Sequence, residues 1–188
     1  MSDTHYFVAA VLPQEFKQHI ERYYSILKDA LPFQRWVHPE DLHLTLAFLG
    51  KSGQEQLQKL VHDLNLLLQE KQAFSVTLHG LSTFGKVTSP RVLWCGIKRK
   101  DELFSIQKAV YNICTQNGYA LDQRPYSPHI TLARKWLSEE PFRENTPVAS
   151  AFTEEFSYKI KIKEIAIYKT CLNRTPKYNP IHKFQLLT

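Results

Sequence analysis

The sequence has few of the features that mark secreted, disulfide-bonded or membrane-spanning proteins. Its three cysteines, Cys95, Cys114 and Cys171, are an odd number at wide spacing without a C-x-x-C motif. They indicate neither a disulfide framework nor a cysteine-rich zinc site. No apolar run approaches the roughly 20 residues of a membrane-spanning helix, and residues 1–5 lack the basic and hydrophobic regions of a signal peptide. We therefore expect a cytoplasmic protein with reduced cysteines.

The composition is that of a globular protein with a basic surface. Of the 188 residues, 43% are hydrophobic and 12% aromatic, which is enough for one well-buried core or for two small lobes that share one. The formal net charge is +6 and the sequence pI is about 9.2. A positive field attracts phosphate groups, so this charge favours a polyanionic partner.

One short segment occurs twice, and the second copy follows the first by 86 residues. Residues 43–46 read His-Leu-Thr-Leu, and residues 129–132 read His-Ile-Thr-Leu. On a regular strand the side chains alternate between faces. In the first copy we therefore expect one polar face with His43, Thr45 and Ala47, and one apolar face with Leu42, Leu44, Leu46 and Phe48.

The repeated residues are suited to acid-base chemistry on an anion. Imidazole is the side chain that titrates near neutral pH, so two histidines together can serve as general base and general acid. The hydroxyl groups of Thr45 and Thr131 can each donate a hydrogen bond to an anionic oxygen. A single His-x-Thr on a strand is more often structural, but its duplication favours a shared site.

The surrounding pattern repeats with the same offset. An apolar strand at residues 6–12 corresponds to residues 92–98, and a strand at 74–81 corresponds to 160–167. An amphipathic helix whose apolar stripe runs from Phe16 to Leu31 corresponds to the segment 101–118. Asp101 is expected to cap the second of these helices, and Ser52 with Glu55 has the spacing of a capping box before a helix at 57–68. That last helix has no counterpart, because prolines within residues 137–156 favour a loop.

This repeat predicts an α+β fold in which residues 1–188 form a single bilobal domain. The two pseudo-symmetric lobes would have antiparallel-rich sheets flanked by helices, and the two His-x-Thr strands would face each other across a cleft between the lobes.

Other chemistries fit the sequence less well. Residues 80–86 resemble a P-loop, but Val87 stands where a magnesium-binding hydroxyl is needed and a strand follows where a helix should begin. Neither histidine has neighbouring ligands at zinc spacing, and no nucleophile elbow suggests a Ser-His-Asp site. We expect no metal, no cofactor and no nucleotide triphosphate.

Three further residues are candidates for substrate binding. Arg134 lies five residues after His129, so a regular strand would place it on the opposite face, yet its guanidinium suits a phosphate clamp at the mouth of the cleft. Phe48 has the matching position in the first copy and is expected to pack or stack. Arg91, with Lys86, either faces phosphates or is solvated surface.

Together these motifs resemble the two-histidine phosphoesterase superfamily. The fuller resemblance is to its bacterial and archaeal branch of RNA 2′,3′-cyclic phosphodiesterases, historically called 2′-5′ RNA ligases. Besides both His-x-Thr motifs, it rests on segments through residue 135 with the sequences FVA at 7–9, RVLW at 91–94 and RPYSPHITLAR at 124–134.

The resemblance implies metal-independent hydrolysis of RNA 2′,3′-cyclic phosphate ends to 2′-phosphomonoesters. It also implies His129 as general base, His43 as general acid, Thr45 and Thr131 at the phosphate oxygens and Arg134, with Arg91, on the RNA backbone. The near symmetry of the two motifs leaves the opposite assignment of base and acid open. Weak ligation, hydrolysis of small cyclic nucleotides or 2′,5′-linked oligonucleotides, and a noncatalytic RNA-binding module remain alternatives. RNA ends or nucleoside 2′,3′-cyclic phosphates are the expected partners of a monomer, with no membrane partner.

Overall fold

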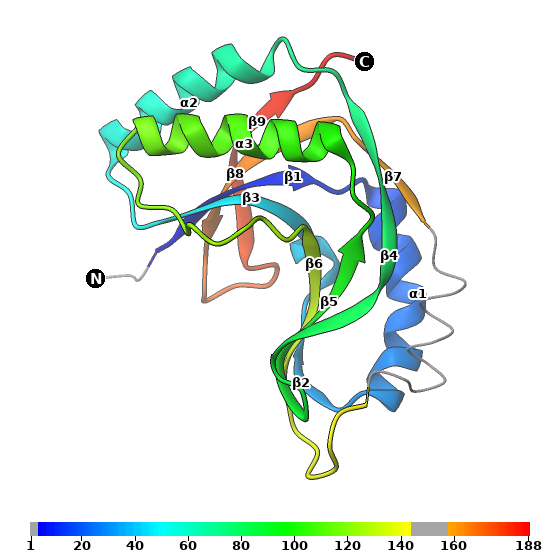
Figure 1. Ribbon diagram of the computed structural model, residues 1–188. Helices are drawn as coiled ribbons and strands as arrows, with labels where there is room; N and C mark the ends of the chain where they lie inside the picture. The colour runs from blue at the N-terminus through cyan, green and yellow to red at the C-terminus, as the bar shows by residue number, and fades with distance from the viewer. Residues whose placement is uncertain (1–3, 144–157) are drawn as a thin grey trace.

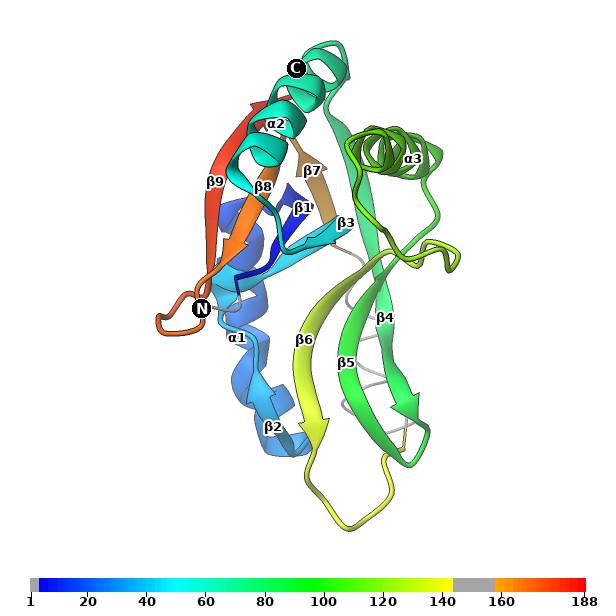
Figure 2. The same ribbon diagram turned by 90° about the vertical axis from the view of Figure 1, so that its left-hand side faces the viewer.

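The protein has an α+β fold with two antiparallel sheets (Figures 1 and 2). The computed structural model describes residues 4–143 and 158–188. The first sheet has the strand order β3-β1-β8-β9, and the second has the order β2-β6-β5-β4-β7. The predicted fold class is therefore confirmed.

The first sheet is built from both ends of the chain. It contains β1 (Tyr6–Val11), β3 (His43–Gly50), β8 (Glu164–Thr170) and β9 (Tyr178–Gln185). Because β1 pairs with β8 through Phe7 and Tyr168, and with β3 through Ala9 and Thr45, β1 lies between the first His-x-Thr strand and the C-terminal strands. β3 is at the edge of this sheet.

The second sheet comes mainly from the middle of the chain. Its strands are β2 (Phe33–Trp36), β4 (Phe74–Lys86), β5 (Ser89–Ile97), β6 (His129–Trp136) and β7 (Lys159–Ile162). The second His-x-Thr strand, β6, pairs with β5 on one side and β2 on the other.

Three α-helices lie in the described part of the chain: α1 (Gln14–Ala30), α2 (Gln54–Leu68) and α3 (Asp101–Gln116). A short 3-10 helix, η1 (Pro39–Asp41), precedes β3. Helices α2 and α3 contact each other, and α1 lies apart from them (Figure 1). No helix among the described residues has the length and apolarity to cross a membrane.

Both predicted helix caps are wrong. Lys100 is the N-cap of α3 and Asp101 is the first helical residue, so its carboxylate is near the positive helix end without capping it. Gly53 is the N-cap of α2, and the Ser52 hydroxyl is hydrogen-bonded to the Tyr119 hydroxyl.

The 86-residue offset relates observed elements as well as sequence. It places β1 on β5, α1 on α3, β3 on β6, and β4 on β7 and β8. The bounds of β3 and β6 coincide after the shift. The counterpart of α2 falls largely on residues 144–157, outside the described residues, while residues 137–143 contain no helix. That the chain forms a single domain stays a prediction.

One apolar core lies between the sheets and the helices. It includes Leu44 of the first sheet and Leu132 of the second, both with 0% exposure, together with the apolar faces of all three α-helices. A smaller cluster of Phe7, Ala9, Ala166 and Tyr168 covers the opposite face of the first sheet. This second face is the one that carries His43.

Candidate active site

Strands β3 and β6 bring the two histidines together. The strands contact each other although they belong to different sheets (Figure 2). His43 and His129 each begin their strand. The two rings are close enough that charge on His129 lowers the pKa of His43.

Each histidine ring is held by the same backbone hydrogen bond. His43 Nδ1 lies 2.7 Å from the carbonyl oxygen of Asp41, and His129 Nδ1 lies 2.7 Å from that of Ser127. A carbonyl oxygen can only accept, so Nδ1 carries the hydrogen in both rings. Each Nε2 is therefore the nitrogen that can accept or give a proton during a reaction.

The two threonines lie on the same strand face as the histidines. Thr45 is opposite Ala9 on β1, Thr131 is opposite Trp94 on β5, and both are partly buried. Since residues two apart on a strand point the same way, each hydroxyl lies beside its histidine. The structure thus brings together the four central residues of the predicted site.

A β-bulge in each strand changes the predicted faces. Thr45 pairs with Ala9 and Ala47 with Val8, so β3 advances two residues while β1 advances one. In consequence Leu46 and Ala47 are both buried, and Phe48 returns to the His43 face with 57% exposure. The expectation that Ala47 shares the polar face and Phe48 the apolar one is wrong, because an extra residue interrupts the alternation.

The same bulge occurs in β6. Thr131 pairs with Trp94 and Ala133 with Leu93. Leu132 and Ala133 are both buried, and Arg134 is therefore on the face of His129 rather than on the opposite face. Its charge lowers the pKa of both His43 and His129.

Arg91 is not brought to the histidines by the described contacts. On β5 it lies two and four residues before Leu93 and Cys95, which face the core, whereas Trp94 is directly opposite Thr131. The Arg91 backbone packs closely on Gly85, where an added β-carbon would lie 2.9 Å from its nitrogen. A substrate contact by Arg91 stays a prediction that this position does not favour.

His43 has an aromatic surrounding from the first sheet. Its ring centroid is 4.6 Å from that of Phe7, 5.1 Å from Tyr178 in an edge contact, and 6.2 Å from Tyr168. Burial lowers the pKa of His43 to about 4. The Asp41 carbonyl and carboxylate oppose this shift, while His129 and Arg134 add to it.

Two aromatic rings of the second sheet lie next to His129. Phe84 contacts the ring edge-on at 4.9 Å, and Trp94 lies 5.8 Å away. Burial also lowers the pKa of His129, with a further contribution from Arg134 and an opposing one from the hydrogen bond to Ser127. In the free protein both rings are therefore neutral at pH 7.

Two side chains cover the edge of β3 next to Thr45. The Tyr126 hydroxyl donates to the Thr45 carbonyl oxygen at 3.0 Å, and Gln107 Nε2 donates to that of Leu46 at 3.2 Å. They satisfy backbone groups that an edge strand leaves open.

Sequence reasoning missed several of these neighbours. Phe7, Tyr168 and Tyr178 come from strands distant in sequence, and no local pattern marks them. Asp41 could have been identified from the sequence, because it lies two residues before His43, just as Ser127 lies two residues before His129.

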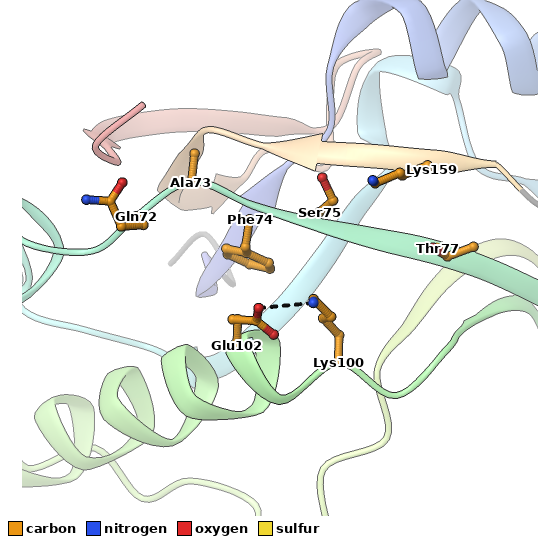
Figure 3. A pocket seen from close by; sticks show the side chains of 8 residues that line it. All are labelled: Gln72, Ala73, Phe74, Ser75, Thr77, Lys100, Glu102 and Lys159. Carbon is orange, nitrogen blue, oxygen red and sulfur yellow. Dashed lines mark ion pairs between the residues drawn. The ribbon is translucent and has the colours of Figure 1, made fainter.

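A separate cavity of about 530 Å³ lies between β4, β7 and the start of α3 (Figure 3). Lys100 and Glu102 form an ion pair of 3.0 Å at this cavity. The predicted site residues, all of which the structure describes, are not in its lining.

The sequence matches the family model described as LigT like Phosphoesterase over residues 11–94 and 97–178. A protein of Geobacillus stearothermophilus is 41% identical over 187 residues, which are 100% of this chain and 59% of that protein. A protein of Bacillus subtilis is 34% identical over 184 residues, covering 97% of this chain and 96% of that protein. Both are named RNA 2′,3′-cyclic phosphodiesterase.

Solved structures share the fold at low sequence identity. LigT of E. coli in complex with 3′-AMP has a TM-score of 0.79 at 23% identity, covering 98% of this chain and 99% of that chain. TT0787 of Thermus thermophilus has a TM-score of 0.77 at 23% identity, covering 97% of each chain. These likenesses support the two-sheet arrangement described above.

Proposed function

Because this chain belongs to the LigT-like phosphoesterase family, we propose that it hydrolyses RNA 2′,3′-cyclic phosphate ends to 2′-phosphomonoesters. The observation that carries the proposal is the pair of histidines on equivalent strands, each with Nδ1 bonded to a carbonyl and Nε2 left for proton transfer. The names of the Geobacillus and Bacillus relatives support this substrate class.

Opening the cyclic phosphate requires a base and an acid on opposite sides of phosphorus. Water attacks in line with the bond from phosphorus to the 3′ oxygen, and that bond breaks as the new one forms. His129 Nε2 takes the proton of the water, while protonated His43 gives its Nε2 proton to the departing 3′ oxygen. An anionic phosphate next to His43 raises the pKa of this partly buried ring, so that it can hold a proton in the complex.

The remaining site residues hold the phosphate and the RNA. The Thr45 and Thr131 hydroxyls donate to the nonbridging oxygens, where charge develops in the transition state. Arg134 binds a phosphate of the RNA, for which its exposure and its proximity to both histidines are suitable. Phe48, exposed on the same face as His43, stacks on a base.

The reaction needs no metal in this proposal. Among the described residues, no three His, Cys, Asp or Glu side chains come together as metal ligands would. The imidazole pair supplies both proton transfers itself. Turnover that is unchanged in EDTA is the expected result, and activity that requires an added divalent cation would give the histidines a ligand role instead.

One assay separates this function from its alternatives. RNA ending in a 2′,3′-cyclic phosphate, a nucleoside 2′,3′-cyclic phosphate and a 2′,5′-linked oligonucleotide are compared, and the products are identified by mass and by phosphatase sensitivity. We expect fastest turnover of the RNA end, to a 2′-phosphate. Faster turnover of either other substrate would change the substrate class, and binding without turnover would indicate a noncatalytic module.

Cellular context follows from the same proposal. Three free cysteines, Cys95, Cys114 and Cys171, suit the reducing cytoplasm. Light scattering is expected to show a monomer, since both histidines come from one chain. Weak joining of RNA ends, in which a 5′-hydroxyl attacks the cyclic phosphate in place of water and the 3′ oxygen leaves, is expected only at high concentrations of such ends.

A further inference from the structure

Asp41 connects His43 to the start of β9. This aspartate is 4% exposed and lies two residues before His43. Its Oδ2 accepts the N–H of Lys177 and its Oδ1 that of Tyr178, both at 2.9 Å. Its carbonyl oxygen accepts the Nδ1–H of His43 at 2.7 Å. One residue therefore contacts a catalytic ring and a segment more than 130 residues away.

The segment that Asp41 holds also forms part of the wall around His43. The ring of Tyr178 lies edge-on to His43 at 5.1 Å and edge-on to Phe7 at 5.0 Å. Because the carboxylate fixes the backbone of Tyr178, it also limits where this ring can lie. The histidine is thus fixed through its own hydrogen bond and through its neighbour.

The second half of the repeat has the backbone contact without the carboxylate. Ser127 occupies the position equivalent to Asp41, and its carbonyl oxygen accepts from His129 at 2.7 Å. Ser127 is exposed, whereas Asp41 is buried. The orientation of the two rings is therefore the same, but only one ring has an acidic side chain at this position.

The charges around the two rings differ accordingly. Of the groups that face His43, η1 contributes Asp41, β6 contributes His129 and Arg134, β8 contributes Tyr168, and β9 contributes Tyr178. Burial has the largest influence and disfavours the protonated His43 ring; Asp41 opposes this, and the two basic groups add to it. For His129, the charged group that acts among the described residues is Arg134, which favours the neutral ring.

We propose that Asp41 is a positioning residue that makes His43 the proton donor of the histidine pair. This inference rests on the proposed function. Before the bond from phosphorus to the 3′ oxygen breaks, His43 must hold the proton that it then gives to that oxygen, and the adjacent carboxylate stabilises this imidazolium. His129, without such a carboxylate, stays neutral and accepts the proton of the attacking water.

The test compares Asp41→Asn with Glu40→Gln. The control makes the same charge change one residue earlier, where the carboxylate pairs with Lys17 of α1 at 2.9 Å. The kcat for RNA cyclic phosphate is measured against pH. In Asp41→Asn we expect kcat to fall about tenfold at neutral pH, as the alkaline limb moves down by about one pH unit. The acidic limb of the pH profile of kcat should stay unchanged in Asp41→Asn, and Glu40→Gln should change neither limb.

A second substrate separates proton donation from structural damage. When sulfur replaces the 3′ bridging oxygen, the thiolate leaves without needing a proton. Asp41→Asn is expected to regain most of its lost rate on this substrate. A loss by the same factor at every pH and on both substrates would overturn the proposal.

Ser127→Asp provides a variant that does not disturb a buried residue. We expect the new carboxylate to raise the pKa of His129 and to move the acidic limb to higher pH. An unmoved acidic limb would contradict the inference even if Asp41→Asn failed to fold. Absence of turnover by the wild-type protein would instead refute the proposed function, so the two failures are distinguishable.

Discussion

The two halves of the site share their geometry and differ in their surroundings. In both, a histidine begins the strand, its Nδ1 is bonded to the carbonyl two residues earlier, and a bulge places the sixth residue on the same face. His43, however, lies among Phe7, Tyr168 and Tyr178 beside a buried aspartate, whereas His129 lies against Phe84 and Trp94 beside an exposed serine. Geometry fixes where protons can move, and the surroundings decide in which direction.

The histidines give the largest expected effects. His43→Ala and His129→Ala should each lower kcat by about 10²- to 10⁴-fold, the usual contribution of one general acid or base. On the substrate with a 3′ bridging sulfur, His43→Ala should recover and His129→Ala should not, because only the base is still needed. Equal recovery of both variants in single-turnover assays would show that the halves have interchangeable roles.

The threonines should give the next largest effects, and similar ones. Thr45→Val and Thr131→Val each remove a donor to a phosphate oxygen while keeping the side-chain shape, so kcat should fall about 10²-fold. Thr45→Ser and Thr131→Ser keep the hydroxyl and serve as controls. A loss confined to KM would mean that the hydroxyls bind the ground state instead.

The pH dependence of stability should distinguish the two rings. The pKa of His43 is lowered from 6.5 to about 4, so the unfolded chain binds this proton more readily than the folded protein between these values. The part of the unfolding free energy that depends on the neutral His43 ring is fully present above pH 6.5. It is lost as the pH falls towards 4, by about 2 kcal/mol for this partly buried ring. His43→Asn should therefore flatten the dependence of the unfolding free energy on pH in urea titrations.

His129→Asn is the matched comparison for that measurement. The pKa of His129 is also lowered by burial, but against the two rings of Phe84 and Trp94 rather than the three rings around His43. We therefore expect His129→Asn to flatten the pH dependence of the unfolding free energy less than His43→Asn does. An equal or larger flattening would show that the His129 ring is desolvated at least as strongly as the His43 ring.

Arg134 and Phe48, which follow the two bulges, should contribute to RNA binding in different ways. Arg134→Ala removes charge-assisted hydrogen bonds to phosphate, which are each worth about 1.5–3 kcal/mol, so KM for RNA should rise about tenfold or more. Phe48→Ala should raise it less, because stacking on one base contributes about 1–3 kcal/mol, and only for substrates with a base in reach. Loss of the Arg134 effect at high salt would indicate steering of RNA rather than contact.

Loss of the hydrogen bond that joins Tyr126 to β3 should give the smallest effect. Tyr126→Phe removes the hydrogen bond to the Thr45 carbonyl oxygen and should cost about 1 kcal/mol of unfolding free energy. Gln107→Ala, which removes the neighbouring bond to Leu46, is the control for the edge of β3. If only Tyr126→Phe also lowers kcat, the contact positions Thr45 as well as covering the edge.

Residues 43–46 and 129–132 could be recognised from the sequence because strand alternation and a fixed offset are local properties. The same reasoning placed Phe48 and Arg134 on the wrong face, since one inserted residue reverses the alternation and leaves no mark in the sequence. The aromatic residues around His43 could not be predicted from the sequence either. Tyr178 meets Phe7 only because the chain ends pair with β1, and such pairing depends on the whole fold.

The shared apolar core has a consequence for how activity is lost. Leu44 and Leu132 lie in one cluster, so neither sheet can bury its apolar face when the other is absent. Fragments that end between β5 and α3 should therefore fail to fold separately and should fold only when mixed. Heating should yield one calorimetric transition at which fold and turnover disappear together, and no partly folded form that keeps a single histidine in place.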